Sequence, residues 1–337
     1  MRGITTLRFG NREPTAKAVA APVLTAKHGV HHVQCALTTT DPNGGGGLYC
    51  LDLDNGALTK VIGRDCIGFA KYKSGFILGC HAEPKATEPL RYRDGADWES
   101  FYAHSLLWLS ESLSIKAEIR CSMWNAADIH EICAYRQKLY VIDTFGNRLL
   151  EFRGPGDQKD PFGLSLSRFW DDPQAREPDS THLTSVVCHH EKLLVARFGP
   201  FCRHREYVER GRSGQILDVS GPFQDKPSPA KVVVDGLADP HSLLIREGEL
   251  CFTEARRRIA RLGEARWHSP VGGYVRGLCP VPDGWLIGVS GSRHSQHTGP
   301  PRAQIYWTDF SGASSELVSE LPASEVYSIV PLDALRT

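Results

Sequence analysis

The sequence predicts an all-β protein, a six-bladed β-propeller closed by its C-terminal strand. The main observation is an internal repeat, in which a short apolar run leads through a polar turn into a second apolar run. Five copies align without gaps and begin at Asp65, Asp128, His182, Asp239 and Tyr274, and a shorter sixth copy occupies residues 325–332. A repeat of roughly 45–60 residues built only of short strands is typical of a propeller or a related array.

The composition fits this class. With 32 Gly and 21 Pro among 337 residues the chain is rich in turns, and its hydrophobic fraction of 41% provides a full core. We expect one propeller domain (26–337) preceded by an N-terminal arm (1–25). Lys+Arg and Asp+Glu both number 39, so no net field favours nucleic acid or an anionic membrane as a partner.

The expected compartment is the cytoplasm. No segment approaches the ~20 apolar residues that cross a bilayer, and the first 24 residues lack the apolar core of a signal peptide. Several of the ten cysteines lie within apolar strands and none forms a CxxC pair, which favours reduced structural thiols over a zinc ribbon. The oligomeric state is left open.

The strands follow from alternating apolar residues and turn signals. Residues 31–40, 47–54 and 57–63 supply the second, third and outer strands of the first blade, and 325–332 supply its innermost strand. Both ends of the chain then share one blade, which closes the ring and removes its open edges. Blades two to six are expected to begin near Cys66, Asp128, His182, Asp239 and Tyr274.

The second blade contains a long insert, so five or seven blades remain alternatives. Within that insert, residues 94–112 have the i, i+3, i+4 apolar spacing of a helix. Three long loops, 81–104, 197–214 and 290–303, are rich in His and Arg and are expected above the mouth of the channel, where binding residues collect. Alternatively, these three loops are solvated surface loops. The run 256–258 (Arg-Arg-Arg) is expected to be an exposed strand edge.

Ionisable residues recur on the innermost strands, and they are the candidate site. Aligning the repeats places one set in a single column: Ile67, His130, Thr184, His241, Arg276 and Tyr327. A second set stands two residues earlier: Asp65, Asp128, His182, Asp239, Tyr274 and Glu325. Because inner strands surround one channel, these side chains are expected to converge.

Three imidazoles that leave an open position form a known catalytic metal arrangement. We therefore expect His130, His182 and His241 to bind a divalent transition metal, zinc or iron rather than calcium. Asp128 and Asp239 lie on the same strand face as two of these histidines and are expected to ligate or to orient them. Alternatively, inner-strand His and Asp residues hydrogen-bond to neighbouring blades and are structural.

Arg276 and Tyr327 are suited to hold a carboxylate or to stabilise developing negative charge. The predicted function is an enzyme that acts on a small polar or anionic metabolite at the channel mouth, with metal-assisted lactone hydrolysis, elimination or epimerisation as its reaction. Without a metal, a His/Asp pair would serve as general base. The alternative is a non-catalytic propeller that binds a protein or peptide through its loops, but such a module is expected to expose aromatic residues.

Residues 120–295 resemble an uncharacterised bacterial propeller family. Its successive blades carry an Asp-x-His segment, as in DIHEICAYRQKLYVIDT from Asp128, then His-Leu-Asn, Pro-His-Ser and Arg-Gly motifs. The chain has HLT from His182, PHS from Pro240 and RG from Arg276, so Thr184 stands where the family has Asn. The resemblance implies a propeller but no agreed reaction. More distantly the chain is similar to gluconolactonase, strictosidine synthase and NHL-type six-bladed propellers, of which the first group holds a cation with Glu, Asn and Asp.

Overall fold

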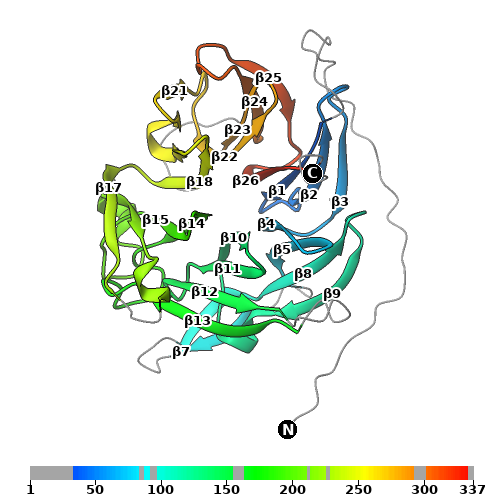
Figure 1. The fold of residues 1–337 in the computed structure, drawn as a ribbon. Coiled ribbons are helices and arrows are strands. Elements are labelled where there is room, and N and C mark those ends of the chain that lie inside the picture. Colours follow the sequence, from blue (N-terminus) through cyan, green and yellow to red (C-terminus); the bar gives the residue numbers. More distant parts are fainter. Residues whose placement is uncertain are drawn as a thin grey trace.

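A computed structural model describes residues 33–82, 87–91, 97–154, 163–210, 213–224, 228–291 and 301–332. Six four-stranded antiparallel sheets stand around a common axis as blades (Figure 1). The predicted all-β, six-bladed propeller is therefore confirmed. The arm predicted for residues 1–25 lies outside the described residues, and the division at residue 26 stays a prediction.

Each blade is described from the axis outward. Blade one comprises β26 (Glu325–Pro331), β1 (Gln34–Thr40), β2 (Gly47–Asp52) and β3 (Leu58–Ile62). Blade two comprises β4 (Cys66–Tyr72), β5 (Gly75–His81), β8 (His104–Ser110) and β9 (Ile115–Arg120). Blade three comprises β10 (Ile129–Tyr135), β11 (Lys138–Asp143), β12 (Arg148–Arg153) and β13 (Ser165–Asp171).

Blade four comprises β14 (Leu183–His189), β15 (Lys192–Arg197), β16 (Gly214–Asp218) and β17 (Lys231–Leu237). Blade five comprises β18 (Pro240–Arg246), β19 (Glu249–Glu254), β20 (Ile259–Leu262) and β21 (Ala265–His268). Blade six comprises β22 (Tyr274–Val281), β23 (Gly284–Ser290), β24 (Gln304–Thr308) and β25 (Glu316–Glu320). The remaining elements are the hairpin β6 (Thr87–Arg91) and β7 (Asp97–Tyr102), α1 (Tyr207–Arg210), and the 3-10 turns η1 (Cys121–Trp124), η2 (Gly221–Phe223) and η3 (Ala255–Arg257).

The predicted closure by the C-terminal strand is confirmed. β26 pairs with β1 from Thr40 opposite Glu325 to Cys35 opposite Pro331, and the two strands lie side by side in Figure 1. The core lies between neighbouring sheets, and the closing seam is packed in the same way. There Leu37 joins buried residues of blade six such as Ile305 in one apolar cluster.

Both alternatives raised by the insert in blade two are wrong. The insert forms the hairpin β6–β7 between β5 and β8 and adds no further blade. The segment with helical spacing, 94–112, contains strands β7 and β8. Along β8, Leu106 and Trp108 pack into one apolar cluster, while Leu107 and Leu109 pack into another. A strand covered on both faces is a continuous apolar run, which periodicity alone does not distinguish from a helix.

Every inner strand has a bulge near the predicted column of site residues. The pairing with the second strand shifts after Cys66, Ile129, Leu183, His241 and Arg276, and the pairing of β26 with β1 shifts at the equivalent point. A bulge bends its strand and re-aims a side chain. The repeat in the sequence therefore corresponds to a repeated irregularity of the backbone.

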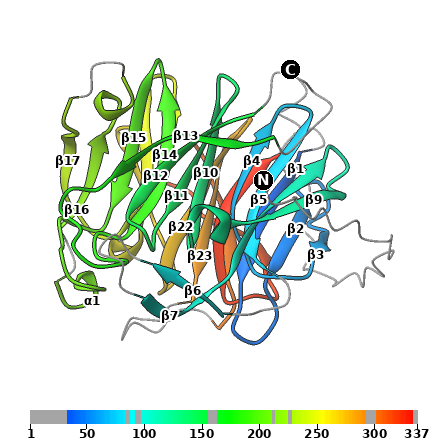
Figure 2. The same ribbon diagram turned by 90° about the horizontal axis from the view of Figure 1, so that it is seen from below.

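The inner strands begin at one end of the propeller, which we call the loop face. The hairpin β6–β7 and α1 both lie at this end, at the lower edge of Figure 2. They belong to two of the three long loops predicted there. Among the described residues, no helix is long and apolar enough to cross a membrane.

Candidate functional site

Five predicted site residues pack together where the inner strands begin. The ring centroid of His130 lies 5.0 Å from that of His182, 6.4 Å from that of His241 and 5.6 Å from that of Tyr327. The Arg276 guanidinium lies 4.8 Å from the Tyr327 ring. We call these five residues the histidine–arginine cluster. His130, His241 and Arg276 are at most 9% exposed, so the cluster is nearly closed to solvent.

A repeated left-handed turn introduces three of the inner strands. Asp128, His182 and Asp239 directly precede β10, β14 and β18 with φ of 53°, 49° and 54°. Their carbonyls accept N–H bonds from Thr144, Phe198 and Ala255, the residues that follow β11, β15 and β19. A positive φ at a non-glycine residue costs energy and persists only where the surrounding structure imposes it. Such residues collect at functional sites.

His182 is held by a buried carboxylate. Its Nδ1 lies 2.6 Å from Oδ1 of Asp179, whose side chain is fully buried. Because a carboxylate only accepts, Nδ1 carries the proton and Nε2 keeps its lone pair. The ring also packs on Phe198 and Tyr207, with centroid distances of 4.2 and 4.5 Å. This is the arrangement of a general base whose tautomer and orientation are set by a carboxylate.

Asp179 itself is anchored by two further groups. Its Oδ2 accepts bonds from Arg205 Nε at 2.9 Å and from the Tyr207 hydroxyl at 3.0 Å. Burial opposes the charge of Asp179, but His182 and Arg205 outweigh burial and hold the pKa of this carboxyl below its usual value. The carboxylate is therefore charged at neutral pH and holds His182 in one orientation.

The sequence reasoning missed Asp179, Phe198 and Tyr207. Asp179 stands three residues before His182, outside the aligned columns, and its only sequence signal is an Asp-x-x-His spacing. Arg205 lies in the predicted 197–214 loop, whose His and Arg residues were expected near the channel mouth. The loop contributes Arg205 and Tyr207 to this assembly. Residues 292–300 of the predicted 290–303 loop lie outside the described residues.

His241 is oriented by a backbone group. Its Nδ1 lies 2.9 Å from the carbonyl oxygen of Asp239, so Nδ1 donates and Nε2 keeps its lone pair. The carboxylate of Asp239 accepts instead from Arg256 Nε at 3.0 Å and from the Tyr274 hydroxyl at 3.1 Å. Of the arginine run at 256–258, Arg257 and Arg258 are exposed as predicted, but Arg256 belongs to the turn η3 rather than to a strand edge and binds Asp239.

Asp128 lies at the border of the cluster. Its Oδ1 is 3.7 Å from Nε2 of His130, which is longer than a hydrogen bond. Its backbone N–H donates to Nδ1 of His104 at 3.1 Å. The side chain is 22% exposed, so Asp128 is the most accessible acid of the predicted set beside the three histidines.

Arg276 lies between two tyrosines and retains unused donors. Its guanidinium is 5.3 Å from the Tyr274 ring and 4.8 Å from the Tyr327 ring. Nη1 is 3.6 Å from Oε2 of Glu325, which also accepts the Tyr327 hydroxyl at 2.7 Å. Among the described residues, Arg276 Nε and Nη1, His130 Nδ1 and His241 Nε2 are buried without a hydrogen-bond partner. Such groups are costly to bury unless a ligand completes them.

The electrostatic field of the cluster keeps its buried histidines neutral. Burial, followed by His182 and Arg276, lowers the pKa of His130 well below its usual value. Burial, followed by Arg276 and His130, lowers the pKa of His241 in the same way. Burial also opposes the charge of Arg276, but Tyr327 and Glu325 raise its pKa on balance. At neutral pH, His130 and His241 are therefore neutral imidazoles beside a guanidinium cation.

The histidines fit a metal in part. Metal-ligating histidines donate their second N–H to a carboxylate or carbonyl, as His182 does to Asp179 and His241 to the carbonyl of Asp239. The spacing does not fit, because no three His, Cys, Asp or Glu side chains in the described part of the chain are placed to hold one ion. The three-histidine metal site stays a prediction, and the proposed reaction does not use a metal.

Comparison with known proteins supports the fold. No protein-family model and no curated protein matches the chain. The propeller in the crystal structure of a nidogen/laminin complex superimposes with a TM-score of 0.58 at 10% identity, over 89% of this chain and 98% of that one. A Bacteroides fragilis protein described as a "putative 6-phosphogluconolactonase" gives 0.50 at 11% identity, with coverage of 89% and 98%. The Pseudomonas aeruginosa periplasmic gluconolactonase gives 0.49 at 11% identity, with the same coverage. The chain thus has a distant structural similarity to gluconolactonase-like propellers.

Proposed function

We propose that this protein is an enzyme that hydrolyses a small polar lactone at the histidine–arginine cluster and releases an anionic hydroxy acid. The observation that carries the proposal is a set of buried nitrogens on Arg276, His130 and His241 that have no hydrogen-bond partner in the described part of the chain, beside the His182–Asp179 pair. Unused donors on a buried cation suit an oxygen on which negative charge develops. A histidine oriented by a carboxylate suits the activation of water.

The reaction follows from these roles. Nε2 of His182 takes a proton from water, and the water oxygen attacks the carbonyl carbon of the lactone. Arg276 stabilises the resulting oxyanion through its free N–H groups, while Asp179 stabilises the imidazolium. The ring C–O bond then breaks, and His182 returns the proton to the leaving oxygen. The second proton of the attacking water passes to solvent, and the product is a hydroxy acid whose carboxylate remains on Arg276.

The substrate class follows from the hydrogen-bond acceptors of the cluster. A structurally similar protein is described as a lactonase, but a likeness at 11% identity speaks for the fold alone. The neutral His130 and His241 would accept hydrogen bonds from hydroxyl groups of the ring, which favours a sugar-derived lactone. Elimination or epimerisation of a sugar acid would use the same base and the same cation.

The test is a turnover assay on a panel of aldonolactones, neutral and acidic, followed through acid release. Sugar acids in the same panel detect elimination or epimerisation. Asp179→Asn should lower kcat by on the order of 10³-fold or more, because the amide no longer fixes the tautomer of His182. Arg276→Gln should lower kcat/KM by on the order of 10²–10³-fold, the usual effect of losing an oxyanion donor.

The matched control is His268→Gln, on the exposed outer strand of blade five, which should retain full activity. A merely structural role of Asp179 would lower the amount of folded protein but not the kcat of what remains folded. Folded protein that turns over no member of the panel would refute the proposal, and so would fully active Asp179 and Arg276 variants.

A further inference from the structure

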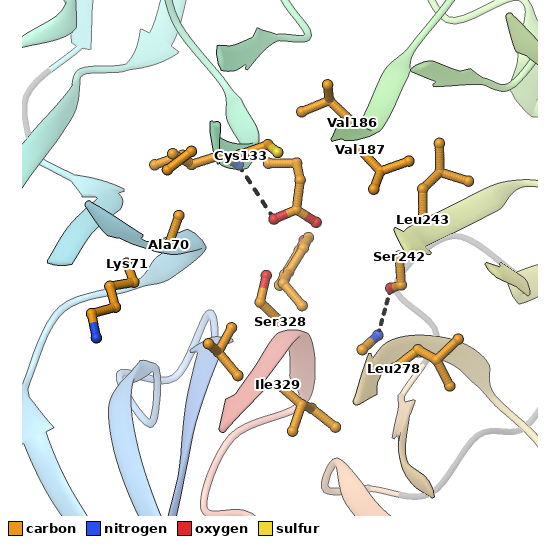
Figure 3. Close-up of a pocket in the computed structure, with 16 residues that line it drawn as sticks. Ala70, Lys71, Cys133, Val186, Val187, Ser242, Leu243, Leu278, Ser328 and Ile329 are labelled. Atoms are coloured by element: carbon orange, nitrogen blue, oxygen red, sulfur yellow. Dashed lines mark hydrogen bonds between the residues drawn. The ribbon is translucent and has the colours of Figure 1, made fainter. Parts of the chain in front are cut away.

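A cavity lies further along the axis than the histidine–arginine cluster and begins at the bulges. It has a volume of about 330 Å³ and is lined by residues from all six inner strands (Figure 3). This volume is at the lower end of the range for small-molecule sites. The lining comes from the middle and far parts of the strands, whereas the histidine–arginine cluster lies at their beginnings. Of the cluster, only Tyr327 also lines this cavity.

The wall of this cavity is mainly apolar. Val187, Leu243, Leu278 and Ile329 border it from four different blades (Figure 3). Lys71 is the one basic lining residue, and its ammonium group points away from the centre of the cavity in Figure 3. The space therefore suits the hydrocarbon body of a ligand.

A single acid faces this apolar space. Among the described residues of the lining, Glu131 is the only acidic one, and it lies on the bulge of β10 between Ile129 and Ile132. Its Oε1 accepts the N–H of Ile132 at 3.3 Å, while the hydroxyl of Ser328, another lining residue, donates to the carbonyl of Ile67 at 3.1 Å. Ser242 accepts the N–H of Gly277 at 2.8 Å, and no acceptor for its own proton is found among the described residues.

We propose that this cavity binds a small organic cation, with its ammonium group on Glu131 and its apolar body against Val187, Leu243 and Leu278. The negative charge of a carboxylate in apolar surroundings is costly when no positive group lies beside it. A cationic group on the ligand would supply that positive charge. A bare metal ion does not fit the same chemistry, because hard cations require six or more oxygen ligands. The inference is independent of the proposed lactone hydrolysis.

The experiment is calorimetric titration of the full-length protein with three probes of one size, phenethylammonium, 2-phenylethanol and phenylacetate. Burial raises the pKa of Glu131 to about 8. The titrations are therefore run at about pH 9, where an alkylammonium near the lysine value of about 10.4 is still charged. We expect phenethylammonium to bind at least about tenfold more tightly than 2-phenylethanol, and phenylacetate more weakly than either.

Two variants and one control locate the binding. Glu131→Gln should reduce the affinity for phenethylammonium to that for 2-phenylethanol, and Val187→Phe should abolish binding of both by filling the cavity. Glu191→Gln, at a glutamate whose side chain is 75% exposed, should change nothing. The proposal is overturned if the neutral or anionic probe binds as tightly as the cation, if Glu131→Gln has no effect, or if no probe binds at about 10 mM.

Discussion

Acidification should destabilise this protein through two buried histidines. Burial and the neighbouring cluster residues hold the pKa of His130 and of His241 well below its usual value. In the unfolded chain each imidazole titrates near 6.5. Between that value and the folded pKa, the unfolded chain binds one more proton than the folded protein at each histidine, so acid favours unfolding.

The size of the effect follows from linkage. Each histidine adds about 1.4 kcal/mol per pH unit to the slope of the unfolding free energy, so the pair adds about 2.7. The stabilising contribution is fully present above about pH 6.5 and is lost progressively as the pH falls below it. Because each histidine of the unfolded chain is half protonated at pH 6.5, the loss between pH 6.5 and pH 5 is about 3 kcal/mol, a large share of a typical domain stability of about 5–15 kcal/mol.

The measurement is urea unfolding from about pH 5 to pH 8, on protein dialysed against a chelator. His130→Gln and His241→Gln should each lower the slope below pH 6.5 by about 1.4 kcal/mol per unit. His268→Gln, at an exposed position, should leave it unchanged. Equal slopes in the wild type and in both cluster variants would show that these imidazoles are protonated in the folded protein, and the reasoning would fail.

Two further predictions concern closure and metal. Deleting residues 325–337 removes β26 and leaves one edge of β1 unpaired, so we expect unfolded or aggregated protein. Deletion of 333–337 is the control. An unchanged cooperative melt for the longer deletion would refute a stabilising closure. Tag-free protein should carry one equivalent of zinc or iron by elemental analysis, and His241→Gln should lose it. Because the pKa values of His130 and His241 are lowered, acid should release the metal only well below about pH 6.5. Traces far below one equivalent in every preparation would contradict the metal site.

The blades could be predicted because the same local pattern recurs on each inner strand. The residues before these strands take the same left-handed turn at Asp128, His182 and Asp239, and Asp is among the residues that tolerate it. The secondary structure of the insert in blade two could not be predicted. β8 is apolar on both faces, so its residues carry no period that separates a strand from a helix.

The site could be predicted only as far as it follows the repeat. His130, His241 and Arg276 share a column because each lies next to a bulge. Asp179 lies outside the repeat, and its contact with His182 depends on the path of the preceding loop. A bulge depends on how two strands pair, so the sequence of one strand alone does not predict it.

The pairing of β26 with β1 also has a consequence for the order in which the chain matures. The hydrogen bond from Thr40 to Glu325 joins residues 285 positions apart. A ribosome that adds roughly 5–20 residues per second needs roughly 15 to 60 s to bridge that interval. Throughout this time the edge of β1 that will pair with β26 stays open, while the blades between them are being synthesised. The nascent protein therefore passes through a long-lived open form. The free edge of β1 is the part of this form that a chaperone would need to shield.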